Sequence, residues 1–232
     1  MSICYSGFEV DSIIRKTSDQ VRASKKVTMT VFNNFRNDTR VLREAKSLVE
    51  LGLQVRIMAI FSTGQKEEEI IDGVRVSRVI LRPFHLRWIR WWGKRRFWKF
   101  IVPPLLRFIL MPLHRYLMFQ NFESEIIDIL RDDDSDVYHS HDLNTLRLGV
   151  KISRLHGKKL VYDSHELYLD RNRARKAGPI KRMMVKRFEK SLIRKCDRVI
   201  TVNDSIADLL CNRYGINDVE VIMNTPPMQF FP

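Results

Sequence analysis

A short strand-forming run ends in four polar side chains at residues 160–166, LVYDSHE. Acids, a hydroxyl and an imidazole are costly inside a buried strand, so we expect them just past its carboxyl end. Open α/β sheets bind their ligands there. His165 is the best candidate for acid–base chemistry, because an imidazole titrates near neutral pH and Asp163 or Glu166 could fix its tautomer. The alternative is a structural histidine bonded to a backbone carbonyl.

Two other runs share this design, DVYHSHD at 136–142 and RVITVNDS at 198–205. Three strands with polar tips on one edge of a sheet predict the rim of a cleft. His139 and His141 are two residues apart, so on a strand both point to the same face. They are either a metal pair or hydrogen-bonded histidines at the rim. Because no third ligand stands at a recognisable spacing, we expect no metal site.

The loop NNFRNDTR, residues 33–40, separates a strand-like run from a helix-like one. Its polar and basic side chains surround a helix amino terminus, an arrangement suited to phosphate or to sugar hydroxyls. Arg40 and Glu44 are also four residues apart and could simply pair along the helix. The turn lacks G-x-G-x-x-G, which argues against a conventional dinucleotide enzyme.

Strand and helix patterns alternate along most of the chain. KVTMTVF at 26–32 is rich in β-branched residues, 38–51 has apolar residues at helical spacing, and QVRIMAIF at 54–61 is again a strand. Further alternation predicts an α/β fold, a doubly wound parallel Rossmann-like sheet of about seven strands. We expect an amino-terminal extension at 1–25, this domain at 26–223, and the start of a linker at 224–232.

The composition indicates a globular protein with a basic surface. The 232 residues are 44% hydrophobic and carry a formal net charge of +14, which suits nucleic acid, anionic lipid or phosphorylated ligands. The three cysteines show no C-x-x-C spacing and predict reduced thiols in the cytoplasm. The first residues do not resemble a secretory signal.

Residues 82–119 form a basic aromatic insertion that holds all four tryptophans and no Asp or Glu. Its longest apolar stretch, 101–113, is shorter than the roughly 20 residues that span a bilayer. Interleaved aromatic rings and cations favour contact with an anionic membrane surface. The alternatives are a helical hairpin packed on the protein and a nucleic-acid surface, for which no recognition motif is present. The predicted membrane-binding residues are Trp88, Trp91, Trp92, Lys94, Arg95, Arg96, Trp98 and Phe100.

Four segments in order resemble the amino-terminal half of a glycosyltransferase of family 4, a retaining enzyme of the GT-B type. They are NDTRVLREAKSLVELGLQVRIMAI, DVYHSHD, KLVYDSHE and KCDRVITVNDSIADLL, and the resemblance covers about 26–226. It implies two Rossmann-like domains across a cleft, the first binding the acceptor and the second most of the nucleotide sugar, with no metal or other cofactor. It places His165 at the catalytic cleft. The expected substrate-binding residues are Asn33, Asn34, Arg36, Asp38, Arg40, His141, Asp142, Asp163, Glu166 and Asn203.

Two departures from the family pattern matter. The first loop has no glycine where many relatives have several, and the sequence contains no carboxyl-terminal donor domain, which we expect in cis or as a separate chain. We therefore predict the acceptor-binding half of a hexosyltransferase, peripheral on the inner face of the membrane. It would use a nucleotide sugar and a lipid-linked or cell-envelope glycan, and no nucleic acid. The alternatives are a noncatalytic membrane-recruiting subunit of a split enzyme and a sugar-nucleotide epimerase.

Overall fold

The computed structural model describes residues 25–82, 104–170 and 178–223, with the backbone alone for 104–112. The extension predicted at 1–25, apart from Lys25, and the linker predicted at 224–232 lie outside these residues. So do all the predicted membrane-binding residues of the insertion. The strands are β1 (Lys26–Thr30), β2 (Gln54–Ile60), β3 (Glu68–Ile71), β4 (Val74–Val79), β5 (Val137–His141), β6 (Lys159–Ser164), β7 (Arg198–Thr201) and β8 (Glu220–Val221).

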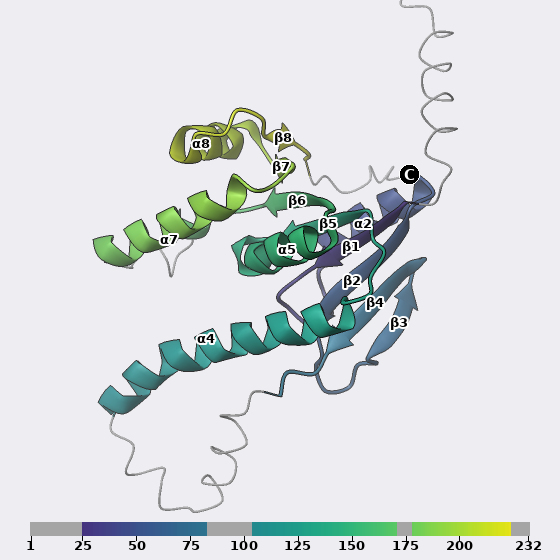
Figure 1. Ribbon diagram of the computed structural model, residues 1–232, viewed down its shortest axis with the longest axis horizontal. Helices are drawn as coiled ribbons and strands as arrows, with labels where there is room; N and C mark the ends of the chain where they lie inside the picture. Colours follow the sequence, from purple (N-terminus) through teal and green to yellow (C-terminus); the bar gives the residue numbers. More distant parts are fainter. Residues whose placement is uncertain (1–24, 83–103, 171–177, 224–232) are drawn as a thin grey trace, which may run out of the picture.

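These strands form one sheet in the order β3-β4-β2-β1-β5-β6-β7-β8 (Figure 1). All neighbouring pairs are parallel except β3 and β4, which form an antiparallel hairpin. The hairpin turns at Asp72 and Gly73, both with positive φ, as a two-residue hairpin turn requires. The doubly wound parallel sheet predicted from the sequence is confirmed, with this hairpin at one edge.

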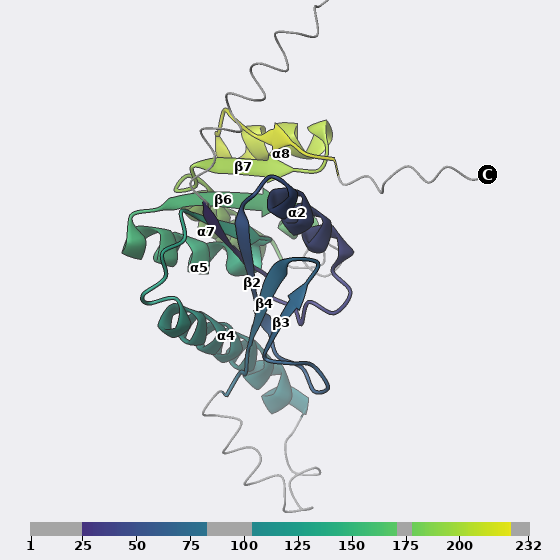
Figure 2. The ribbon, with the colours of Figure 1, turned by 90° about the vertical axis from the view of Figure 1, so that its right-hand side faces the viewer.

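Helices cover both faces of the sheet. They are α2 (Thr39–Glu50), α4 (Pro104–Ile129), α5 (Leu143–His156), α7 (Pro179–Ile193) and α8 (Asp204–Tyr214), with a 3₁₀ turn η2 (Tyr168–Asp170) before α7. Figure 2 shows α2 on one side of the strands and α4 and α5 on the other. The chain winds outward from β1 through β2 in one direction and from β5 through β8 in the other. The carboxyl ends of β1 and β5 therefore meet at the point where the winding reverses, the usual ligand-binding position in such sheets.

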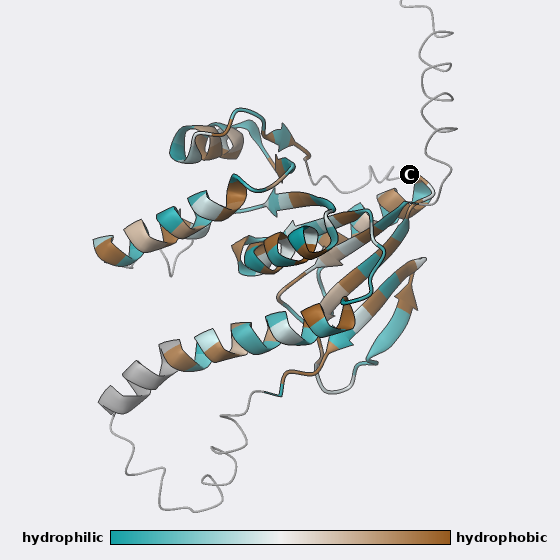
Figure 3. Ribbon diagram, in the orientation of Figure 1, coloured by the Kyte–Doolittle hydropathy of each residue, from teal (hydrophilic) through white to brown (hydrophobic). Residues whose placement is uncertain are grey.

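Two hydrophobic cores follow from the alternation of strand side chains. Ile57 of β2 packs with Val41 and Ala45 of α2, whereas its neighbour Met58 packs in the larger core under α4 and α5. Figure 3 shows hydrophobic residues along the strands between these helices. The core on the α2 side and the core on the α5 side together cover both faces of the sheet.

Helix α5 packs closely on β5. A Cβ at Gly149 would lie 2.1 Å from Ser140 Oγ, so only glycine permits this approach. Thr145 at the start of α5 donates its hydroxyl to the His141 carbonyl oxygen at 2.7 Å. These contacts fix the end of β5, where the two histidines of the DVYHSHD run stand.

Helix α4 begins earlier than the sequence pattern indicates. Apolar spacing predicts a helix at 122–130, but α4 starts at Pro104 and runs through Pro112. Proline at the first position of a helix costs nothing, whereas one in the interior usually interrupts it. The carboxyl-terminal half of α4 buries Phe122 and Ile126 in the core. Among the described residues, no helix is both long and apolar enough to cross a membrane.

Candidate active site

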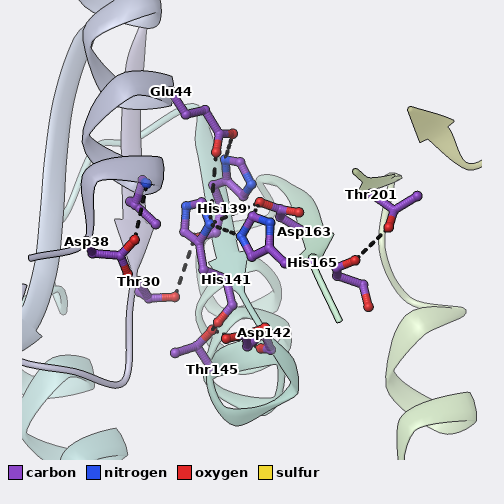
Figure 4. A network of polar contacts seen from close by, with 12 residues as sticks. Thr30, Asp38, Glu44, His139, His141, Asp142, Thr145, Asp163, His165 and Thr201 are labelled. Carbon is purple, nitrogen blue, oxygen red and sulfur yellow. Dashed lines mark hydrogen bonds and ion pairs between the residues drawn. The ribbon is translucent and has the colours of Figure 1, made fainter. Parts of the chain in front are cut away.

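Four ionisable side chains project from the ends of β5 and β6 toward the α2 side of the sheet. Tyr138 and Tyr162 belong to the core on the α5 side. Because strand side chains alternate between faces, residues 139, 141, 163 and 165 must face α2. The register places His141 directly opposite Asp163. The spacing His-x-His on one strand and Asp-x-His on the next thus brings four groups into one cluster (Figure 4).

Asp163 is the centre of this cluster. Its Oδ2 lies 2.7 Å from His165 Nε2 and 3.2 Å from His141 Nδ1. The two imidazoles stack with ring centroids 5.7 Å apart, and His141 also stacks on His139 at 4.3 Å. Of the two acids proposed to orient His165, the structure shows Asp163 in contact with it. Glu166 is exposed and has an interaction of its own.

Glu44 reaches the cluster from α2. Its Oε1 is 3.3 Å from His139 Nδ1 and its Oε2 is 4.0 Å from His141 Nδ1. From the sequence, Glu44 is expected only as a partner of Arg40 along the helix and not as a member of the site. The available signal was its position three residues after buried Val41, on the helix face that packs against the sheet. An acid on that face needs a buried partner.

Burial and close contacts shift the protonation of these groups. Burial raises the pKa of Glu44 to about 7. Burial alone would also raise the pKa of Asp163, but hydrogen bonds from His141 and His165 outweigh it and hold that pKa well below its usual value. The carboxylates of Asp163 and Glu44 raise the pKa of His141 against the effect of burial. Burial lowers the pKa of His139 far below its usual value, so its imidazole is neutral.

A pocket of about 310 Å³ opens beside this cluster. Arg40, Arg43 and Glu44 of α2 line one wall, and Asp163 and His165 line another. Residues from the ends of β7 and β8, among them Thr201 and Met223, complete it. His141 Nδ1 and His165 Nε2 are 3.5 Å apart, so the structure brings together the two histidines that the sequence places on separate strands. His165 Nδ1 is buried without a hydrogen-bond partner among the described residues.

The β1–α2 loop is shaped by its own polar side chains. Asp38 caps α2 by accepting from Val41 N at 3.3 Å, and Asn33 Nδ2 donates to Asp38 Oδ2 at 2.8 Å. Asn34 Oδ1 accepts from the backbone of Arg36. A shallow depression of about 430 Å³ is lined by residues 33–34 and 36–40. The Asp38 carboxylate sits where a phosphate would meet the helix amino terminus, which favours sugar hydroxyls over phosphate at this loop.

Arg78 of β4 holds the β1–α2 loop through a hydrogen bond, a role that is not predicted from the sequence. Its side chain is buried and pairs with Glu69 at 2.5 Å. It also donates to the carbonyl oxygens of Asn34 at 3.2 Å and Lys66 at 2.9 Å. No sequence signal could have found it, because an arginine in a strand is usually exposed and only the structure shows that this one is buried.

Two further predicted residues lie at strand ends but outside the histidine cluster. Asp142 follows His141 at the N-cap of α5, and its side chain makes no capping hydrogen bond there. Asn203 caps α8 by accepting from Ile206 N at 2.9 Å, so its amide oxygen already has a local partner. Contact of either residue with substrate stays a prediction.

A family model described as Glycosyltransferase Family 4 matches residues 99–225, more than half of the chain. The chain belongs to glycosyltransferase family 4. The matched region contains β5, α5, β6 and β7, and so includes His139, His141, Asp163 and His165. The resemblance noted from the sequence is confirmed.

Two solved chains of one enzyme share the fold of this family 4 chain. Sucrose-phosphate synthase from Thermosynechococcus elongatus aligns with a TM-score of 0.57 and 12% identity, over 86% of this chain and 48% of that one. A second, shorter chain of the same synthase aligns with a TM-score of 0.53 and 11% identity, over 86% of this chain and 87% of that one. MurG from Acinetobacter baumannii aligns with a TM-score of 0.46 and 12% identity, over 86% of this chain and 45% of that one. No curated protein sequence matches. The chain thus spans about half the length of the first synthase structure.

Proposed function

We propose that this chain is the acceptor-binding half of a retaining glycosyltransferase of the hexosyltransferase type. It transfers a sugar from a nucleotide sugar to a lipid-linked or cell-envelope glycan at the membrane. The observation that carries this proposal is the position of His165 in the wall of the pocket, with Nε2 held by Asp163 at 2.7 Å and Nδ1 free of hydrogen-bond partners among the described residues. With its Nε2 N–H donated to Asp163, His165 has Nδ1 as an acceptor, which a sugar hydroxyl would reach once the buried ring turns toward the pocket.

The other half of the cleft comes from a second Rossmann-like domain that binds most of the nucleotide sugar. The pocket lies where parallel strands end, so a facing domain would close over it and exclude water from the transfer. The donor domain is supplied in cis or by a separate chain.

Helix α7 supports membrane contact, independently of the tryptophan-rich segment. Ile180, Met184 and Phe188 stand four residues apart and are 71%, 64% and 42% exposed. The exposed cations of Lys181 and Arg187 lie on the same helix. Apolar side chains at helical spacing beside cations suit an anionic lipid surface. A lipid-linked acceptor would be presented to the pocket from that surface.

The test of the catalytic assignment is His165→Ala in the protein together with its donor domain. The probes are radiolabelled UDP-glucose, UDP-N-acetylglucosamine and GDP-mannose, with membranes of the source organism as acceptor. We expect turnover into the lipid-extractable fraction to fall on the order of 100-fold or more, because a preorganised hydrogen bond at the reacting sugar is lost. Circular dichroism and thermal unfolding check that the variant folds.

The matched control is His114→Gln, which replaces a histidine of α4 outside the cluster and should leave turnover unchanged. Equal turnover in wild type and His165→Ala would remove His165 from the site. The anomeric configuration of the product, measured by ¹H NMR, tests retention. If the wild-type protein with its donor domain transfers no sugar from any probe, the noncatalytic recruiting subunit becomes the better explanation.

A further inference from the structure

Glu44, His139, His141 and Asp163 form a compact cluster on three separate elements. One potential ligand atom from each of these side chains lies within 4.8 Å of the other three. The side chains of His139, His141 and Asp163 are 5% or less exposed, and that of Glu44 is 23% exposed. Two imidazoles and two carboxylates so close together are the usual components of a metal site.

Two of the separations among these atoms match the coordination shell of zinc. A tetrahedron with bonds of about 2.0–2.2 Å has edges of about 3.3–3.6 Å. The corresponding separations are 3.3 Å between His139 Nδ1 and Glu44 Oε1, and 3.2 Å between His141 Nδ1 and Asp163 Oδ2. The distance between His141 Nδ1 and Glu44 Oε2 is 4.0 Å, which a small rotation of the glutamate side chain would shorten.

Hydrogen bonding among the described residues does not satisfy this cluster by itself. His141 Nδ1 lies near Asp163, Glu44 and His165 Nε2, yet one ring nitrogen carries at most one hydrogen. Incompletely satisfied buried polar atoms indicate an ion or ordered water that completes the arrangement.

We propose that Glu44, His139, His141 and Asp163 bind a divalent transition-metal ion of the zinc class. Two imidazole ligands select against Mg²⁺ and Ca²⁺, which prefer oxygen ligands alone. Because four protein groups close the coordination sphere, the ion has a structural role and leaves no position for substrate. It joins α2 to the ends of β5 and β6, and so fixes the helix that lines one wall of the pocket.

His165 acts in the outer shell of this ion. Its Nε2 lies 2.7 Å from Asp163 Oδ2 and orients that carboxylate toward the cluster. Outer-shell partners of this kind are worth about 10- to 100-fold in metal affinity. The metal site and the sugar pocket therefore share Glu44 and Asp163 in their common wall, while the ion itself lies on the β5 side of His165.

The experiment measures binding of Zn²⁺ to the chelator-treated protein by isothermal titration, with Co²⁺ as a spectroscopic probe. We expect one Zn²⁺ per chain, intense visible absorption of tetrahedral Co²⁺, and a rise in Tm of roughly 5–10 °C at a 100-fold excess over Kd. Glu44→Gln and His139→Gln should each weaken Zn²⁺ binding at least about 100-fold, since even outer-shell changes cost about 10- to 100-fold. His114→Gln should bind as wild type does, and Mg²⁺ should give no comparable effect.

The proposal is wrong if folded wild-type protein binds no stoichiometric Zn²⁺. It is also wrong if Zn²⁺ affinity is the same in wild type, Glu44→Gln and His139→Gln, because binding would then occur elsewhere. The wild-type titration does not depend on whether any variant folds. Neither readout requires sugar transfer, so failure of the metal site and failure of the proposed function can be told apart.

Discussion

Asp142 adopts a backbone conformation, φ 64° and ψ 161°, that essentially only glycine reaches without strain. Its neighbours hold it there. Its N–H donates to the Asp163 carbonyl oxygen at 2.9 Å, and its own carbonyl oxygen accepts from Thr145 N at 3.2 Å. These bonds link the ends of β5 and β6 beside His141. Strain of this kind is commonly retained where a side chain serves a site.

A pair of variants separates this strain from the loss of the carboxylate. Asp142→Gly and Asp142→Ala both remove the carboxylate, but only glycine relaxes the positive φ. We therefore expect Asp142→Gly to exceed Asp142→Ala in free energy of unfolding by about 1–2 kcal/mol. Urea denaturation of the two proteins measures the difference. Equal midpoints and slopes would show that residue 142 is not strained.

Helix α7 is attached to the domain through a buried acid. Glu189 accepts from the Tyr162 hydroxyl of β6 at 3.2 Å and from the Tyr214 hydroxyl of α8 at 2.6 Å. Burial raises the pKa of Glu189, although these two donors partly oppose it. Arg213 and Asp170 are the nearby charged groups. The Glu189 carboxyl group thus joins α7 to β6 and α8. Burial disfavours the charged form of this group.

The raised pKa makes this junction sensitive to pH. The pKa of such a group is higher in the folded protein than in the unfolded chain. Its contribution to stability is therefore complete at a pH below the unfolded-state pKa, and is lost as pH rises through the folded-state pKa. The free energy of unfolding of wild type minus that of Glu189→Gln should therefore fall as pH rises from about 4 to about 8. Urea denaturation across this range tests it, because other titrations cancel in the difference. A difference independent of pH would contradict the expectation.

The surface of the whole molecule combines a formal net charge of +14 with the exposed apolar side chains of α7. Helix α7 lies beside α5 on one side of the sheet (Figures 1 and 3), and its buried residues stand in its carboxyl-terminal half. Ile180, Met184 and Phe188 are exposed to solvent. Contiguous exposed apolar side chains commonly mark a site that a partner or a membrane covers.

Vesicle flotation tests whether that surface is a membrane. We expect the protein to float with vesicles that contain anionic lipid, and the floated fraction to fall at about 1 M salt, where the Debye length is about 3 Å. Met184→Ser with Phe188→Ser should also reduce flotation, because the apolar contact is lost. Leu51→Ser with Leu155→Ser is the control, since both leucines are exposed on other helices or their ends. Equal flotation of the two double variants would rule out α7 as the contact.

The sequence alone determined the order of strands and helices, because apolar periodicity and capping residues act over a few neighbours. The periodicity of a strand also predicted that His139 and His141 share a face, and that Asp163 and His165 do, because residues two apart on a strand point to the same side. The family resemblance followed from these runs in their order. The start of helix α4 was predicted wrongly, because a proline inside a helix usually interrupts it. In the structure α4 nevertheless continues through Pro112.

Only the tertiary structure decided which of these groups meet. The register of β5 against β6 set His141 opposite Asp163, and it depends on strand pairing between segments about 20 residues apart. Glu44 enters the cluster, and Arg78 supports the β1–α2 loop, through packing of elements distant in the chain. Such contacts follow from burial of whole helix and strand faces, which no spacing within a single segment encodes.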